Sequence, residues 1–346
     1  MRWNKVCLET IAYVLPDEVV ATGTLEAQLA RMYAALNLEG GQVAALTGIE
    51  QRRMWPANPV MSACAAQAGK KALEASGVPA EDLGAVIYAG VCRDNLEPAT
   101  ACAVAEALGT GPDTLVFDVS NACLGVLNGM VEIANRIELG QIRAGIVVSA
   151  ESSRAIVEST IARMNADPTL ERYRLGLATL TGGSGAVAVV LTEAGYSDSE
   201  HRLVAGAALS APEHHRLCRW GPARGLLGET PNLMDTDASQ VLAHGVVLGE
   251  QTWAKFLKTT GWRTEEVDRV ITHQVGAGHR REVLARLGID ESRDFSTFAS
   301  LGNIGTVSVP LTAARAAEAG FLRAGDRVGL LGIGSGLNCL MLGAQW

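Results

Sequence analysis

The chain has 346 residues, of which 48% are hydrophobic and 19% are charged. A chain of this length and composition can bury a large core, which excludes a wholly disordered protein. Its formal net charge is −8, whereas proteins that bind the nucleic-acid backbone are usually basic, so we expect no nucleic-acid partner.

The ends and the cysteines of the chain bear on where the protein works. Glu9 and Asp17 stand where a signal peptide needs an unbroken apolar run. No uncharged apolar stretch approaches the ~20 residues of a membrane span. None of the seven cysteines forms a C-x-x-C pair, so nothing predicts a zinc site, and scattered cysteines fit a reducing compartment. We therefore expect a cytoplasmic protein without membrane insertion and without a bound metal.

Short apolar runs alternate with helix-like stretches, which is typical of an α/β protein whose sheet is covered on both faces. A segment rich in Pro, Gly, His and charge, Tyr196–Asp237, is expected to be a connection with irregular loops. A helix is predicted over Ala238–Thr260, with Gly261 as the residue that ends it. The predicted strands are Ala85–Gly90, Gly145–Ser149, Ala186–Leu191, Arg269–Thr272 and Val328–Gly332.

A weak internal repeat relates the two ends of the chain. Glu81 and Glu265 open similar acidic segments before two predicted strands. Ile146 and Gly329 open two similar apolar runs, and their separation along the chain is almost the same as that of the first pair. Two matches at nearly the same offset indicate a duplicated α/β plan. We therefore expect two similar halves, residues 1–195 and residues 196–346.

Cys123 is the first candidate for chemistry. It lies within Phe117–Met130, where a short strand runs through small polar residues into a helical pattern. This layout places Cys123 at or near a helix N-terminus, where the helix dipole and free N–H groups favour a thiolate and lower its pKa. The same N–H groups can hold the oxyanion formed when a thioester is attacked. A buried structural cysteine gives the same local pattern, so both interpretations stay open.

Two polar residues in the second half are further candidates. His273 ends an apolar strand, where parallel α/β sheets gather ligands, and a thiolate nucleophile generally has an imidazole nearby. Asn303 stands between Gly302 and Gly305, where a side-chain amide can donate to a carbonyl or enolate oxygen. A structural histidine and an ordinary turn give the same patterns, so each residue taken alone stays open.

A run of alternating glycines ends the last predicted strand, at Gly332, Gly334 and Gly336. Glycine lets the backbone approach a ligand closely. The spacing is not the dinucleotide fingerprint G-x-G-x-x-G, and the chain lacks the G-x-S-x-G motif of serine hydrolases. Neither of those two classes is therefore predicted.

Taken together and in this order, the segments around Cys123, His273 and Asn303 resemble the ketosynthase III branch of the thiolase superfamily. The resemblance covers essentially the whole chain. It implies an α/β fold with five αβαβα layers built from two duplicated halves, and a homodimer. It also implies that the backbone N–H groups of Cys123 and Gly336 form an acyl oxyanion hole, while His273 and Asn303 bind the carbonyl of a second thioester.

Details of these motifs are similar to the OleA family, which joins two fatty acyl-CoA molecules head to head. Decarboxylating synthases typically show His-Gln-Ala-Asn and Gly-Asn-Thr-Ser. This chain instead has His-Gln-Val-Gly from His273 and Gly-Asn-Ile-Gly from Gly302. The segments Arg93–Thr100 and Leu331–Cys339, together with the terminal Trp346, are also similar to that family.

Glu97 distinguishes the two kinds of condensing enzyme. Loss of CO₂ from a malonyl thioester generates a carbanion without a base, whereas a non-decarboxylative Claisen condensation must remove an α-proton. In the OleA family a Glu in the matching Leu-Glu-Pro segment removes this proton from the neighbouring subunit. The resemblance assigns that role to Glu97, while a solvated loop Glu is the plain alternative.

Four arginines are candidates for binding the phosphates of CoA, because the planar guanidinium can donate two hydrogen bonds to a phosphate. Arg52 and Arg53 lie where relatives contact CoA, and Arg219 and Arg216 are weaker candidates. A solvated surface charge explains Arg52 and Arg53 about equally well, and it explains Arg216 and Arg219 better than phosphate binding does.

The resemblance implies a Cys-bound acyl intermediate and a 2-alkyl-3-oxoacyl-CoA product, with acyl-CoA as substrate and no cofactor. It also points to downstream enzymes of a hydrocarbon or lipid pathway as partners. Alternatives are a decarboxylative starter synthase of the ketosynthase III type that uses malonyl thioester, a non-catalytic partner subunit of another ketosynthase, and a thioesterase.

Overall fold

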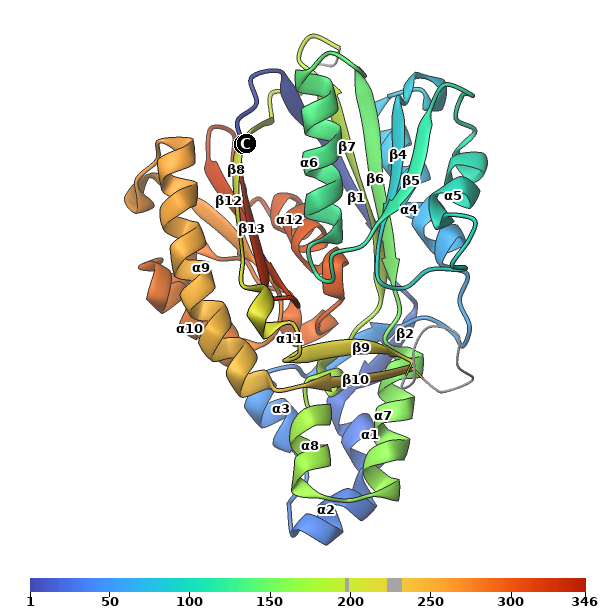
Figure 1. Cartoon of the computed structure of the whole chain (residues 1–346), viewed down its shortest axis with the longest axis vertical. Helices are drawn as coiled ribbons and strands as arrows, with labels where there is room; N and C mark the ends of the chain where they lie inside the picture. The colour runs from blue at the N-terminus through green and yellow to red at the C-terminus, as the bar shows by residue number, and fades with distance from the viewer. Residues whose placement is uncertain (197–198, 223–231) are drawn as a thin grey trace.

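The computed structural model describes residues 1–196, 199–222 and 232–346, and the structural statements below concern these residues. Nine strands form one mixed sheet in the order β11-β12-β13-β8-β1-β7-β6-β4-β5 (Figure 1). The strands are β1 (Val6–Val14), β4 (Ala85–Ala89), β5 (Leu115–Val119), β6 (Ala144–Glu151), β7 (Gly185–Glu193), β8 (Arg202–Ser210), β11 (Arg269–Thr272), β12 (Arg327–Gly334) and β13 (Asn338–Gln345).

One set of helices covers and separates two parts of this sheet. They are α4 (Met61–Ser76), α5 (Thr100–Leu108), α6 (Gly125–Glu138), α9 (Ala238–Thr260), α10 (Ala277–Leu287) and α12 (Ser308–Glu318). The two parts of the sheet meet where β1 pairs with β8 at Cys7–Arg202, and the bridge Arg2–Ala205 extends this contact. In Figure 1 they stand apart, with α6 and α12 between them.

The layers alternate between helix and sheet. Helices α4 and α5 contact the strands of the first part, and α9 contacts β8 and β13 of the second, with α10 packed on α9. Helices α6 and α12 contact strands of both parts, so they form the central layer. One apolar core joins side chains of this layer to both parts of the sheet, including Leu127, Met130, Leu311, Val189 and Leu330. The predicted αβαβα fold is confirmed.

The same strand plan occurs twice. In the first part β4 is parallel to β6, which is antiparallel to β7, which is antiparallel to β1. In the second part β11, β12, β13 and β8 repeat these relations in the same order. The separation along the chain between the starts of β4 and β11 is almost equal to that between the starts of β6 and β12, as the sequence repeat predicted. The division of the chain at residue 195 stays a prediction.

One prediction about the elements was wrong. Arg202–Ser210 lies within the segment expected to be irregular, yet it forms strand β8 and pairs with β13 along its length. Its sequence is rich in Ala and Gly, which are weak strand formers, so only pairing with neighbouring strands specifies it. The helix Ala238–Thr260 is confirmed, and Gly261 ends it with φ 78°. Residues 197–198 and 223–231 of the same segment lie outside the described residues.

The other elements gather at one end of the layers, below the central helices in Figure 1. They pack around their own apolar cluster, which includes Leu29, Met32 and Met164. In the described part of the chain, no helix combines the length and the apolar character needed to cross a membrane. The elements of this end are α1 (Thr22–Ala27), α2 (Ala30–Leu36), α3 (Gln42–Thr47), α7 (Arg154–Ala166), α8 (Leu170–Gly176), β2 (Glu18–Ala21), β3 (Gln51–Met54), β9 (Cys218–Pro222) and β10 (Asn232–Thr236).

Candidate active site

Cys123 lies in the turn between β5 and α6, just before the helix begins. Ala122 precedes it with φ 46°, a left-handed conformation that costs a non-glycine residue free energy and is common at functional turns. The N–H of Leu124 donates to the Asn121 carbonyl (2.9 Å), and the N–H of Val126 donates to the Thr306 hydroxyl (2.7 Å). The turn and the first helical turn are therefore held by both halves of the chain.

A cavity of about 450 Å³ opens beside this turn. Cys123 and Asn303 both line it, so the structure brings these two predicted residues together. The wall also includes Glu151 and Cys218, which the sequence did not single out, and Arg219, which was a weaker candidate. We call this space the nucleophile cavity.

The thiol of Cys123 is not a resting thiolate. Burial raises its pKa to about 12, and the nearby Cys218 and Glu151 act in the same direction. The prediction that the helix end lowers the pKa of Cys123 is therefore wrong for the free protein. Loss of hydration around the sulfur raises this pKa by more than the helix end lowers it. A base must take the proton during the reaction.

His273 follows β11 directly and is 4% exposed. Its N–H donates to the Leu331 carbonyl of β12 (3.0 Å), while its side-chain Nδ1 has no hydrogen-bond partner among the described residues. Burial first, and the neighbouring His279 second, lower the pKa of His273 to about 3. The imidazole is therefore neutral, and it can accept a proton or donate a hydrogen bond.

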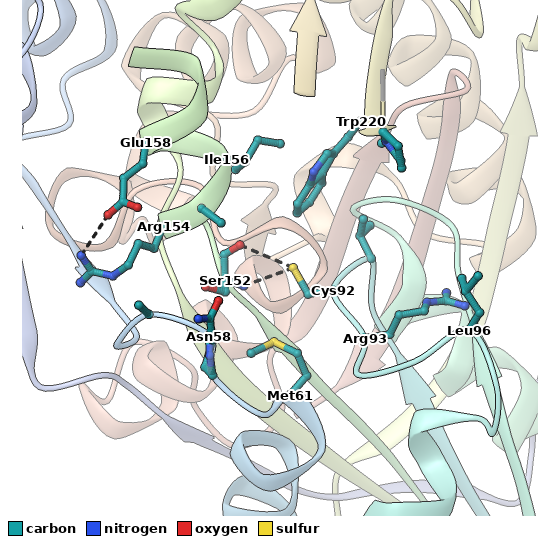
Figure 2. A pocket seen from close by; sticks show the side chains of 16 residues that line it. Asn58, Met61, Cys92, Arg93, Leu96, Ser152, Arg154, Ile156, Glu158 and Trp220 are labelled. Carbon is teal, nitrogen blue, oxygen red and sulfur yellow. Dashed lines mark hydrogen bonds and ion pairs between the residues drawn. The ribbon is translucent and has the colours of Figure 1, made fainter. Parts of the chain in front are cut away.

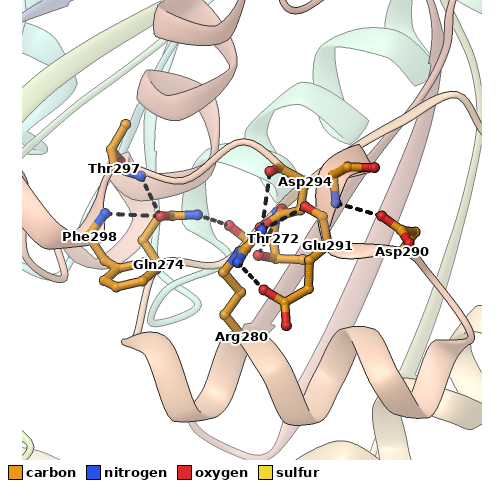
Figure 3. Close-up of polar contacts among 9 residues, drawn as sticks. Thr272, Gln274, Arg280, Asp290, Glu291, Asp294, Thr297 and Phe298 are labelled. Atoms are coloured by element: carbon orange, nitrogen blue, oxygen red, sulfur yellow. Dashed lines mark hydrogen bonds and ion pairs between the residues drawn. The ribbon is translucent and has the colours of Figure 1, made fainter. Parts of the chain in front are cut away.

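The position of His273 follows from buried polar contacts at the end of β11 (Figure 3). The Gln274 amide donates to the Thr272 carbonyl (2.7 Å), and its oxygen accepts from the N–H groups of Thr297 (2.8 Å) and Phe298 (3.1 Å). The Asp294 carboxylate accepts from the N–H of Thr272 (3.1 Å). These contacts fix the strand end against the segment that leads to Asn303.

Asn303 presents its amide NH₂ as a donor. The side-chain oxygen accepts from the N–H of Gly305 (3.0 Å), which leaves the nitrogen end of the amide for another partner. The backbone of Asn303 is held on both sides, by Thr181 (2.9 Å) and Gly183 (2.9 Å). Gly302 has φ 66°, and a Cβ there would lie 2.4 Å from the Thr181 oxygen, so only glycine fits beside Asn303.

The turn at Gly336 lies next to the turn of Cys123. Asn338 follows Gly336, and its amide donates to the side-chain oxygen of Asn121 (3.2 Å), just before Cys123. A Cβ at Gly334 would lie 3.3 Å from the Cys123 nitrogen. Gly336 itself has φ 137°, and a Cβ there would lie 2.3 Å from the Asn338 side-chain nitrogen. Two backbone segments from different halves thus meet at Cys123.

His273 reaches this region through β12. Its ring lines a small cavity that also includes Gly332, rather than lining the nucleophile cavity. A Cβ at Gly332 would lie 2.5 Å from the Leu124 side chain, next to Cys123. The structure therefore does not place the imidazole in the nucleophile cavity, although Gly332 of β12 lies beside both the small cavity and the residue that follows Cys123.

Glu97 is exposed in the loop between β4 and α5 and does not line the nucleophile cavity of its own chain. Its neighbour Leu96 is 61% exposed. Leu96 lines a second cavity of about 640 Å³, which shares Val91 and Trp220 with the nucleophile cavity (Figure 2). Within one chain, the structure does not bring Glu97 and Cys123 together.

The four arginines differ in their surroundings. Arg219 is exposed and lines the nucleophile cavity, whereas Arg216 is exposed and does not line it. Arg53 is half-buried and donates to the carbonyls of Pro16 (3.3 Å) and Asp17 (3.0 Å). Arg52 is fully buried, donates to the Leu180 carbonyl (3.0 Å), and burial lowers its pKa to about 10. The proposal that Arg52 binds CoA phosphates is therefore wrong, because its guanidinium has no access to solvent.

Glu151 is a site residue that the sequence analysis missed. It ends β6, is 4% exposed and lines the nucleophile cavity. Burial raises its pKa to about 7, although its hydrogen bonds from Val91 and Cys92 act in the other direction. The available signal was a carboxylate at the end of an otherwise apolar predicted strand, since Glu is rarely buried.

No group of three or more His, Cys, Asp or Glu side chains is placed to hold a metal ion within residues 1–196, 199–222 and 232–346.

Comparisons with known proteins agree with this architecture. Residues 43–182 match the family model for the thiolase N-terminal domain, and residues 257–346 match the C-terminal model of 3-oxoacyl-[acyl-carrier-protein] synthase III. The acyl-CoA:acyl-CoA alkyltransferase of Shewanella oneidensis is 51% identical, and that of Xanthomonas campestris is 35% identical. Each alignment covers 100% of both chains.

Solved structures of Xanthomonas campestris OleA show the same fold. One of them, with cerulenin bound, superposes with a TM-score of 0.94 at 34% identity, and the match covers 100% of this chain and 98% of that one. Another contains lauric acid and lauroyl-CoA and has a TM-score of 0.93 at 35% identity, with 99% of this chain and 100% of that one covered. The chain therefore belongs to the acyl-CoA:acyl-CoA alkyltransferase (OleA) family of the thiolase superfamily.

Proposed function

We propose that this chain condenses two fatty acyl-CoA thioesters into a 2-alkyl-3-oxoacyl-CoA by a non-decarboxylative Claisen reaction. The observation that carries the proposal is the meeting of Cys123, Asn303 and the Gly336 turn around one cavity in a member of the alkyltransferase family. A half-buried thiol that lines a cavity, an amide donor and converging backbone groups are what acyl transfer between thioesters requires.

In the first half-reaction the Cys123 sulfur attacks the carbonyl of one acyl-CoA. The resting pair is a thiol and a neutral imidazole, so the thiol proton passes to His273 as the carbon–sulfur bond forms. The N–H groups of Cys123 and Gly336 hold the oxyanion. The CoA sulfur then leaves, takes the proton from His273, and an acyl group remains on Cys123.

In the second half-reaction another acyl-CoA binds with its carbonyl oxygen on His273 and the Asn303 amide. Both groups can donate without carrying a charge. Glu97 of the partner subunit removes the α-proton, since a carboxylate near the α-carbon can serve as general base. The carbanion attacks the acyl group on Cys123, the carbon–sulfur bond breaks, and the Cys123 thiolate recovers a proton.

A homodimer makes this arrangement possible. Strand β5 is at the edge of the sheet, and Leu115 at its start is 45% exposed. An open edge with exposed apolar side chains is a surface that another strand can extend. Because the Glu97 loop follows β4, which pairs with β5, pairing of two β5 strands would bring this loop to the partner subunit.

CoA binding, cofactor use and the fate of the product complete the proposal. Arg219 and Arg53 are the arginines that we assign to the CoA phosphates. The reaction transfers an acyl group and protons and involves no oxidation or reduction, so we propose that acyl-CoA is used without a cofactor. Its branched β-keto thioester product would be used by downstream enzymes of lipid or hydrocarbon metabolism, in the cytoplasm.

The test is incubation of the purified protein with one saturated acyl-CoA and no malonyl donor. We expect one condensed β-keto product for every two acyl-CoA consumed, detected by mass spectrometry. Free CoA with fatty acid alone would indicate a thioesterase. Product that forms only after malonyl-CoA is added, at a rate unchanged in Glu97→Ala, would indicate a decarboxylative synthase.

A further inference from the structure

We infer that Glu151 is a positioning residue for condensation, because its carboxylate fixes the start of the loop that carries Glu97. The inference rests on the proposed function, since it assigns a role within the second half-reaction. Glu151 is the last residue of β6, and the Glu97 loop begins where the adjacent strand β4 ends.

Both oxygens of the Glu151 carboxylate are used by this loop. One oxygen accepts from the N–H of Val91 (2.8 Å) and the other from the N–H of Cys92 (3.1 Å). The Glu151 side chain is buried, and the charged group that acts on its carboxylate is the guanidinium of Arg93 in the same loop. A buried carboxylate that binds two successive backbone N–H groups determines the direction in which the chain leaves the strand.

Contacts between Cys92 and Ser152 also hold the start of the loop at the end of β6. The thiol of Cys92 donates to the Ser152 carbonyl (3.5 Å), and the N–H of Ser152 donates back to the Cys92 sulfur (3.4 Å). Figure 2 shows the Cys92 sulfur with both of its contacts to Ser152 at the edge of the second cavity. Cys92 is therefore fixed to the end of β6 by Glu151 and Ser152 together.

Two aspartates clamp the rest of the loop. The Asp94 carboxylate accepts from the N–H groups of Met61 (2.6 Å) and Ser62 (3.2 Å), at the start of α4. The Asp118 carboxylate accepts from the N–H groups of Thr100 (2.9 Å) and Ala101 (2.9 Å), at the start of α5. Helix N-termini favour such negative groups.

Only Asn95–Pro98 is exposed between these clamps, and it contains Glu97. A short segment held at both ends has few conformations, so the position of Glu97 depends on its anchors. Glu151 differs from the two aspartates because it also lines the nucleophile cavity. A Cβ at Gly305, which follows closely after Asn303, would lie 3.7 Å from the Glu151 carboxyl carbon. Glu151 thus joins the loop of the base to the wall of the acyl site.

The inference predicts a selective loss. Removing the anchor should displace Glu97 without removing any group that acylates Cys123. Misplacement of a catalytic group by ~1 Å can cost about 100-fold in rate. We expect Glu151→Gln to slow condensation by ~10- to 100-fold. Acylation of Cys123 should not slow, because the neutral side chain removes a negative group that raises the pKa of the thiol.

The experiment compares wild type, Glu151→Gln, Glu151→Asp and the control Glu158→Gln with one saturated acyl-CoA. Glu158 pairs with Arg154 (3.4 Å) and lines only the second cavity. Acylation is followed by intact mass in rapid quench, and condensation by product formation. Slow condensation with normal acylation in Glu151→Gln, partial recovery in Glu151→Asp and a normal control would support the inference. Equal condensation in Glu151→Gln and wild type, or equal losses in both half-reactions, would overturn it.

Mixed dimers test whether Glu151 acts through the Glu97 loop or through the Cys123 cavity of its own chain. A chain with Cys123→Ala supplies Glu97, and a chain with Glu97→Ala supplies Cys123, so one site of the mixed dimer is complete. Glu151→Gln should reduce condensation when it is placed on the chain that supplies Glu97, and not when it is placed on the other. The opposite result would overturn the inference. If wild type itself forms no condensed product, the proposed function fails instead.

Discussion

At the scale of single residues, Cys123 combines two demands that oppose each other. An acyl chain needs a cavity without water, but the same desolvation raises the pKa of the thiol to about 12. A charged imidazole could not accept the thiol proton, and a neutral one with a low pKa is a weak base, so the proton must move while the sulfur bonds to the thioester carbon rather than before. Burial lowers the pKa of His273 to about 3 and keeps its ring neutral.

The first prediction separates Cys123 from the other thiol in its cavity. Cys123→Ala should form no acyl-enzyme and should lower the condensation rate by at least ~1,000-fold, because no second nucleophile is held by the oxyanion donors. Cys218→Ala is the matched control, since Cys218 lines the same cavity. It should still gain the mass of one acyl group. Acylation of the Cys123→Ala variant would refute this assignment.

The second prediction concerns CoA. Arg219→Ala should raise KM for acyl-CoA about tenfold with little change in kcat, as expected for the loss of one hydrogen bond to a charged group. Arg216→Ala is the control, because Arg216 is exposed outside the nucleophile cavity. Equal KM values for both variants would remove Arg219 from the binding site.

Residue context predicted the candidate site better than residue type did. Cys123, His273 and Asn303 were found because each follows an apolar strand or a glycine turn. Arg52 was misjudged although the sequence held the answer. It lies beside Arg53 on strand β3, where successive side chains point to opposite faces, so one of the two had to be buried.

At the scale of elements, side chains from the second half hold the helix that follows Cys123. The Thr306 hydroxyl accepts from the buried N–H of Val126, in the first turn of α6. Thr306 is 1% exposed, so no water replaces this bond. The contact fixes the nucleophile turn relative to the Asn303 turn.

The third prediction is that Thr306→Val lowers the free energy of unfolding by about 1–3 kcal/mol, because it leaves a buried N–H unpaired. Thr306→Ser retains the hydroxyl and should lose less. Urea unfolding of the three proteins measures the difference. If Thr306→Val and Thr306→Ser unfold at the same urea concentration, the hydroxyl does not stabilise α6.

Strands with strong apolar character were predictable, and weakly patterned ones were not. Strand β6 is buried along its whole length and was predicted. Strand β8 consists largely of Ala, Gly and Leu and becomes a strand only through pairing with β13. Such pairing joins residues that are far apart in the sequence, so the strand propensity of the segment alone does not predict it.

At the scale of the whole molecule, Glu151 makes stability depend on pH. Burial raises its pKa from 4.5 to about 7, so the unfolded chain releases this proton first as pH rises. The unfolded state then binds fewer protons, and the stability of the fold falls across this interval. A pKa difference of this size corresponds to ~3 kcal/mol.

The fourth prediction follows from this difference. The stability of wild type relative to Glu151→Gln should fall by about 3 kcal/mol between about pH 4 and pH 8, because Gln has no proton to release. Urea unfolding at several pH values measures it. Parallel stability profiles for the two proteins would show that Glu151 does not titrate in this range.

The duplicated fold explains why the site lies between the halves. The central helices α6 and α12 contact both parts of the sheet, and residues from each half meet at the nucleophile cavity. The repeat was visible in the sequence as a nearly constant offset. The burial of Glu151 and the shape of the cavities were not, since they depend on how the two halves pack.

A two-stage labelling experiment tests the central claim most directly. The protein is first acylated with one saturated acyl-CoA, excess substrate is removed, and a saturated acyl-CoA of different length is added. The account predicts a mixed 2-alkyl-3-oxoacyl-CoA, in which the carbonyl chain comes from the first substrate and the α-branch from the second. Release of the first chain as free fatty acid, with no mixed product, would contradict it.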